Sequence, residues 1–253
     1  MRDHARRKSR VGFVRIDAGG VLAPEDFGNA FVKLSFSGSK LSVADYFTMT
    51  GTLNEDESDQ DLGSGGPLVL PDLSNGNGTT EHLAIAAGKD GAIYVADRTN
   101  MGKFNATADN IYQELLHAVP EGVWAVPAYF NQTVYYCDQA STLKAFAISN
   151  AKLSGPTSST ATSFEYPGAL PSVSANGTSN GIVWAIENSG EAVLRAYPAN
   201  DLTTELYDSN QAAGSADHPG LGNKFITPAI ADGKVFVATQ KSVAVYGLLS
   251  AQR

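Results

Sequence analysis

The densest group of side chains that could do chemistry is an acidic run near residue 55. Five carboxylates occur between residues 55 and 61: Glu55, Asp56, Glu57, Asp59 and Asp61. Hard cations such as calcium take several oxygen ligands at once, and a carboxylate-rich loop can supply them. Asp59 and Asp61 are the best metal-ligand candidates because they adjoin a sequence repeat. The spacing differs from that of an EF-hand loop, so a solvated acidic loop is the alternative.

The histidines, Ser64 and the single cysteine do not have the spacing of a known metal-binding or catalytic motif. Histidines occur at positions 4, 82, 117 and 218 and form neither His-x-His nor His-Glu-x-x-His. Ser64 lies in Gly-Ser-Gly-Gly, which lacks the spacing of a nucleophile elbow. The single cysteine, Cys137, excludes an internal disulfide, and its apolar neighbours predict a buried strand. No catalytic constellation is evident, and the catalytic residues stay unknown.

Internal repeats predict the elements that position these residues. Each copy has a proline, a short strand, a turn and a second strand, followed by a third strand with alternating apolar residues. Asn or Asp with Gly at the turns suits tight hairpins that need positive φ. The first two strands fall in residues 126–136, 170–186, 227–238 and, more weakly, 66–97, and the third strands in 143–148, 193–197 and 243–248.

These repeats predict an all-β fold, a β-propeller of four-stranded antiparallel blades, with four to five blades in this chain. Residues 1–20 match no part of the repeat and are interpreted as an unrelated leader or tail, so the propeller spans residues 21–253. The end copies are incomplete. Three alternatives stay open: the ring closes between the ends, the chain is a fragment, or closure needs association, giving a homo-oligomer. Apolar residues at helical spacing in 107–118 predict one short helix. The blades are expected near residues 27–49, 62–104, 122–153, 167–208 and 223–249.

Charge and hydropathy restrict the partners. The net charge of -8 and the pI near 4.9 argue against a nucleic-acid or anionic-membrane surface, either of which needs a basic face. The sequence holds no apolar run long enough for a membrane span. The basic run near the start is not followed by the apolar core of a signal peptide, so no export signal is visible.

Several segments resemble the pyrroloquinoline-quinone-like (PQQ-like) propeller repeat. Residues 94–104, with Ala96-Asp97 and Gly102 before Phe104, resemble the signature of that family, in which Ala-x-Asp and a glycine precede a terminal aromatic. Residues 61–67, 97–104 and 178–185 resemble the C-terminal propeller region of uncharacterised bacterial proteins, and the resemblance covers about residues 27–249. It implies an exported bacterial protein, periplasmic or extracellular. True quinoprotein alcohol dehydrogenases carry a vicinal disulfide beside the quinone, which one cysteine cannot form, so PQQ is not expected as the cofactor.

Two functions follow as hypotheses. The first is a binding or scaffold module of an exported bacterial protein, with a small-molecule or protein ligand that stays unknown. The second is a propeller hydrolase, such as a lactonase, esterase or phosphotriesterase, with a calcium-type ion in the central channel; it is favoured over a quinone-dependent dehydrogenase. By analogy with other propellers, the channel-lining candidates are Glu187, Asn188 and Glu191, on the loop after a predicted strand.

Aromatic side chains recur at predicted strand positions. We interpret them as packing between neighbouring blades rather than as a platform for carbohydrate. They are Trp124, Tyr129, Phe130, Tyr135, Trp184 and Tyr197.

Overall fold

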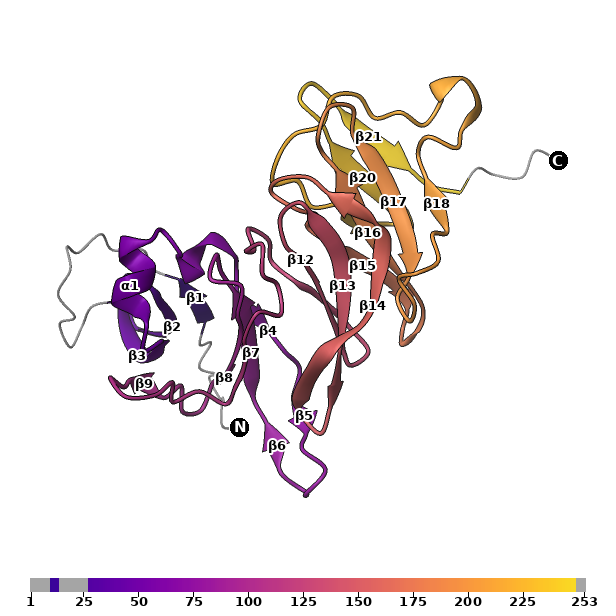
Figure 1. Cartoon of the computed structure of the whole chain (residues 1–253). Coiled ribbons are helices and arrows are strands. Elements are labelled where there is room, and N and C mark those ends of the chain that lie inside the picture. Colours follow the sequence, from indigo (N-terminus) through magenta and orange to yellow (C-terminus); the bar gives the residue numbers. More distant parts are fainter. Residues whose placement is uncertain (1–9, 14–26, 249–253) are drawn as a thin grey trace.

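Figure 1 shows the computed structural model, which describes residues 10–13 and 27–248. Strands make up 47% of the structure and helices 5%, so the predicted all-β class is confirmed. The helical segments are α1 (Thr52–Glu57) and the 3-10 turns Leu62–Ser64 and Ala213–Ser215.

Most strands form sheets that follow one another along the chain, numbered here from one to five. The first sheet has the order β1 (Arg10–Phe13), β2 (Ala30–Ser37), β3 (Lys40–Thr48) and β9 (Lys103–Phe104), with β9 parallel to β3. The second has the order β10 (Gln113–Leu115), β8 (Ile93–Asp97), β7 (Leu83–Ala87) and β4 (Leu68–Val69). A hairpin of β5 (Leu73–Ser74) and β6 (Thr80–Glu81) projects between β4 and β7.

The remaining sheets are antiparallel meanders. The third comprises β11 (Ala128–Phe130), β12 (Thr133–Cys137), β13 (Ser141–Ser149) and β14 (Lys152–Phe164). The fourth comprises β15 (Ser172–Asn176), β16 (Ser179–Glu187), β17 (Val193–Pro198) and β18 (Tyr207–Asp208). The fifth comprises β19 (Ala229–Ala231), β20 (Lys234–Ala238) and β21 (Val243–Tyr246), three strands among the described residues.

Tight turns fix the register of the hairpins. Asp232 and Gly233 have φ of 48° and 68°, and Asn131 and Gln132 have φ of 45° and 65°. Positive φ at both turn residues is the type I′ conformation, whose twist matches that of paired strands. The repeat prolines also fall where predicted, because Pro67, Pro127, Pro171 and Pro228 directly precede β4, β11, β15 and β19.

Neighbouring sheets pack face to face. Successive side chains of a strand point to opposite faces, so one strand can serve two interfaces. In β12, Val134 and Tyr136 pack with the second sheet, whereas Tyr135 and Cys137 pack with the fourth. Corresponding apolar clusters join the first sheet to the second and the fourth to the fifth. Figure 1 shows the sheets in one curved row, with the first and fifth at opposite ends.

Two segments differ from the expectation. The helix predicted for residues 107–118 is wrong, because Gln113–Leu115 forms strand β10 and pairs with β8. Pairing at the open edge of β8 outweighs helical spacing in so short a segment. Arg10–Phe13, within the range interpreted as a leader, forms β1 and pairs with β2.

Candidate functional site

Three aromatic rings from different loops form a continuous row. Trp124 and Tyr166 are 5.4 Å apart between ring centroids at an interplanar angle of 75°, and Tyr166 and Phe225 are 6.2 Å apart at 87°. The Lys224 Nζ lies 4.5 Å from the centroid of the Tyr166 ring. We call Trp124, Tyr166 and Phe225 the aromatic row.

Each ring of the aromatic row lies on a loop that joins consecutive sheets. These loops are residues 116–127, 165–171 and 209–228, each ending at a repeat proline or beside one. Tyr166 is 38% exposed, Phe225 is 51% exposed and Trp124 is partly buried. Single exposed apolar residues are ordinary, but contiguous apolar patches mark interaction sites.

Backbone contacts hold the first two loops against the third sheet. The Asp138 Oδ2 accepts a hydrogen bond from the Glu121 backbone N–H at 3.3 Å, which ties down the loop of Trp124. A Cβ placed on Gly168 would lie 2.9 Å from the carbonyl oxygen of Asp138, so the loop of Tyr166 needs glycine there to pass so closely. Asp138 therefore supports two of the three loops.

The third loop is anchored on the fourth and fifth sheets. The Gly222 backbone N–H donates to the Gly190 carbonyl at 2.8 Å, and the Gln240 side chain donates to the Gly222 carbonyl at 3.0 Å. Phe225 has a φ of 64°, in the left-handed region that bulky residues avoid. A strained residue that displays an exposed ring is a feature found at binding sites.

The predicted metal ligands, Asp59 and Asp61, lie close together, and both form ion pairs with one lysine. The Lys89 Nζ is 2.7 Å from the Asp59 Oδ1 and 2.8 Å from the Asp61 Oδ2. Burial opposes the charge on Lys89, but the hydrogen bonds to both carboxylates outweigh it and raise the lysine pKa. Among the described residues, no three His, Cys, Asp or Glu side chains gather so that they could hold a metal ion.

A second acidic group lies deeper. Burial raises the pKa of Glu55 to about 8, and the nearby charges of Asp90, Asp109 and Glu114 add to this rise. Asn29 opposes it by donating a hydrogen bond to the Glu55 Oε2 at 2.8 Å. Burial also raises the pKa of Asp90 and of Glu114. Perturbed carboxyl groups mark candidate functional sites, but ion networks with structural roles perturb pKa values in the same way.

The three channel-lining candidates each contact a different part of the structure. Glu187 pairs with Arg195, which also pairs with Glu205 at 2.6 Å within the fourth sheet. Asn188 is 9% exposed, and its backbone lies against Gly222 in the loop of Phe225. The Glu191 Oε2 lies 3.3 Å from the His218 Nδ1. Glu187 and Glu191 thus have charged or polar partners of their own, and Asn188 supports the third loop.

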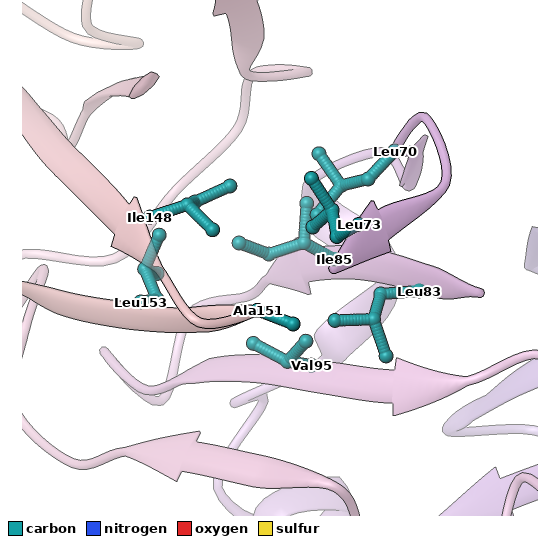
Figure 2. Close-up of a pocket in the computed structure, with 8 residues that line it drawn as sticks. All are labelled: Leu70, Leu73, Leu83, Ile85, Val95, Ile148, Ala151 and Leu153. Carbon is teal, nitrogen blue, oxygen red and sulfur yellow. The ribbon is translucent and has the colours of Figure 1, made fainter. Parts of the chain in front are cut away.

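An apolar hollow lies between the second and third sheets (Figure 2). Its volume is about 10 Å³, close to the least space that a water molecule needs. All the side chains that line it are apolar, so a water molecule would find no hydrogen-bond partner there. The hollow is a packing feature. Its lining residues are Leu70, Leu73, Leu83, Ile85, Val95, Ile148, Ala151 and Leu153.

The other candidates have structural surroundings. Cys137 is fully buried, and burial raises its pKa to about 12, as suits a core residue. The His82 Nδ1 lies 2.7 Å from the Asp72 Oδ1. The aromatics interpreted as packing between sheets do so in every case but Trp124: Tyr129, Phe130, Tyr135, Trp184 and Tyr197 belong to or border the apolar clusters.

The sequence interpretation missed Tyr166 and Phe225, although a signal existed. Trp124, Tyr166 and Phe225 lie three, five and three residues before the repeat prolines 127, 171 and 228. Each of three consecutive repeats thus has an aromatic residue shortly before its proline. Because neighbouring sheets pack side by side, these three residues lie close together.

Comparisons with known proteins concern the fold. No protein-family model matches the chain, and no curated protein matches it. A chain from a humanized mutant of the Chaetomium thermophilum Polycomb Repressive Complex 2 is similar over 99% of this chain and 53% of its own, with a TM-score of 0.58 and 11% identity. A chain of apo ctPRC2 in an autoinhibited state matches over 88% of this chain and 46% of its own, with a TM-score of 0.57 and 11% identity.

A third match is a computationally designed protein, Ika8, at 14% identity and a TM-score of 0.48, over 87% of this chain and 56% of its own. The chain thus spans about half the length of these three matches. At such identities, only the two matches with a TM-score above 0.5 inform the fold, and nothing more. The described part of this chain holds no helix long and apolar enough to cross a membrane.

Proposed function

We propose that the sheets are blades of a β-propeller, and that the chain is a binding module that takes a protein partner at the aromatic row. The observation that carries the proposal is that three consecutive loops present contacting, partly exposed aromatic rings. Aromatic side chains are enriched in protein interfaces and dominate their binding energy.

The packing of the sheets supports the propeller. β15 contacts both β11 and β19, so the first strands of the third, fourth and fifth sheets are neighbours, as the inner strands of blades are around an axis.

The geometry of the rings favours a peptide segment over a sugar. Adjacent rings are nearly perpendicular, so they offer ring edges and no flat platform for a sugar ring. Lys224 has no carboxylate partner among the described residues. The partner we propose is therefore an apolar peptide segment with one carboxylate placed to meet Lys224.

The test is selection of binders from a displayed library of random peptides, followed by measurement of Kd from fluorescence anisotropy. We expect apolar peptides that contain Asp or Glu. Phe225→Ala and Tyr166→Ala should each weaken their binding by about tenfold or more, as loss of an interface anchor does. Leu206→Ala is the control, because Leu206 is 50% exposed and lies outside the aromatic row.

A second readout reports from the site itself. The chain has two tryptophans, so a Trp184→Phe background leaves Trp124 as the single emitter. Selected peptides should shift its fluorescence with the same Kd. The proposal fails if Phe225→Ala binds as the parent does, or if a glycan array binds through the aromatic row while no peptide does.

A further inference from the structure

The third and fifth sheets share one register but differ in what covers them. β12 and β20 both follow two-residue turns, and Tyr135 pairs with Ala145 as Phe236 pairs with Val245. The next matching pairs are Cys137 with Leu143 and Ala238 with Val243. In the third sheet this face is buried against the fourth sheet. In the fifth sheet Val243 is 61% exposed and Val245 is 54% exposed. We call Phe236, Ala238, Val243 and Val245 the trailing face.

The first sheet exposes apolar side chains on part of its opposite face: Ala30 and Val32 are buried there, but the residues nearer the turn between β2 and β3 are exposed. Phe31 and Phe47 pair with each other and pack on the second sheet. On the other side, Phe36 pairs with Leu41 and Leu34 pairs with Val43. Phe36 is 59%, Leu41 62% and Val43 42% exposed. We call Leu34, Phe36, Leu41 and Val43 the leading face.

Every interior contact in the row joins the trailing side of one sheet to the leading side of the next. Among the described residues, one exposed apolar surface of each kind is found, on the first and the fifth sheet, which lie at opposite ends of the row (Figure 1). We propose that the trailing face of one copy packs on the leading face of a second copy, in a head-to-tail contact that continues the series of sheet interfaces.

A second copy is the occupant because it carries both halves of the contact. Such a contact is heterologous: it closes into a ring or extends as a filament, according to the rotation between copies. This inference does not depend on the peptide partner proposed above, because the two surfaces share no residue.

The test measures mass by light scattering and sedimentation over a range of micromolar concentrations. The wild-type chain should exceed its monomer mass of 26.6 kDa as concentration rises. Val245→Glu blocks the trailing face and Leu41→Glu blocks the leading face, so each variant alone should stay monomeric. Mixed in equal amounts, they should form a dimer, since each supplies the face that the other lacks.

Val69→Glu is the matched control, because Val69 is 48% exposed on β4, away from both faces, and should assemble as the wild type does. Thermal unfolding of every variant checks that the glutamates leave the fold intact. A wild-type chain that stays monomeric overturns the proposal. So does assembly by Leu41→Glu alone, which would indicate symmetric pairing of fifth sheets, or a mixture that stays monomeric.

Discussion

The third and fifth sheets carry similar strands, yet one is a core and the other an end. Tyr135 is fully buried, whereas Phe236, at the matching register position, is partly exposed. Leu143 has 0% exposure and Val243 has 61%. The alternation of apolar residues is the same in both sheets. Burial is therefore set by the neighbouring sheet, and a similar strand pattern can serve a core or a surface.

The largest expected effect on stability comes from a substitution at Tyr135, in the buried face of the third sheet. Tyr135→Ala removes a buried ring and the hydrogen bond from its hydroxyl to the Ala199 carbonyl at 2.5 Å. We expect a loss of about 4 kcal/mol in the free energy of unfolding, measured by urea denaturation.

Phe236→Ala is the matched change in the fifth sheet. It should cost about 1 to 2 kcal/mol in dilute protein, because the ring is already partly solvated. Equal losses at the two positions would contradict the contrast between the sheets.

The next prediction concerns an ion pair that the third sheet has and the fifth sheet lacks among the described residues. Lys144 pairs with Asp138, whose side chain has 0% exposure, while Ala244 takes the position of Lys144 in the fifth sheet. Lys144→Met leaves a buried carboxylate without its cation and should cost about 3 kcal/mol.

Lys234→Met is the control for Lys144→Met, because Lys234 is exposed in the fifth sheet and its loss should cost at most about 0.5 kcal/mol. Since Asp138 also supports the loop of Trp124, Lys144→Met should weaken peptide binding at the aromatic row as well. A variant as stable as the wild type would show that the pair adds nothing to the third sheet.

A third prediction concerns the carboxyl group of Glu55 on helix α1, which lies near the charges of Asp90 and Glu114. The pKa of Glu55 rises from 4.5 to about 8 on folding, so the folded protein holds a proton that the unfolded chain releases. This contribution to stability is complete below about pH 4.5 and is lost as the pH rises towards 8. Glu55→Gln should remove that loss and be more stable than the wild type near pH 8.

Unfolding curves recorded between about pH 5 and pH 8 test the role of Glu55. Glu57→Gln, an exposed change on the same helix α1, is the control and should follow the wild type. Parallel curves for wild type and Glu55→Gln would refute the prediction.

The smallest expected effect is a gain in stability from a substitution in the third sheet. The Tyr136 hydroxyl is buried with no hydrogen-bond partner among the described residues, and Val237 occupies the matching position in the fifth sheet. Tyr136→Phe should raise the free energy of unfolding by about 1 kcal/mol, because it removes an unsatisfied polar group without leaving a cavity. Tyr135→Phe is the contrast, since its hydroxyl is hydrogen-bonded and its removal should destabilise the protein.

The sequence predicts the strands well and the site poorly, for physical reasons. Period-two alternation and the turns such as Asp232-Gly233 are local, so β20, β21 and their equivalents could be located. The same reasoning found Asp59 and Asp61 as neighbours but not Lys89 as their partner, because Lys89 is 28 residues from Asp61 in the sequence and so distant a contact has no local pattern. The aromatic row is formed by packing of successive repeats, and single-residue reasoning assigned Trp124 to the core.

The nearest-neighbour packing of the sheets also governs how the molecule should come apart. A row whose members contact only adjacent members can lose its last sheet while the rest stays folded, as repeat proteins fray from their ends. The aromatic row crosses two of these boundaries, since its rings come from loops before the third, fourth and fifth sheets. A ligand that spans all three rings would therefore make the opening of the fifth sheet depend on its neighbours, and would convert a chain that frays into one that unfolds cooperatively.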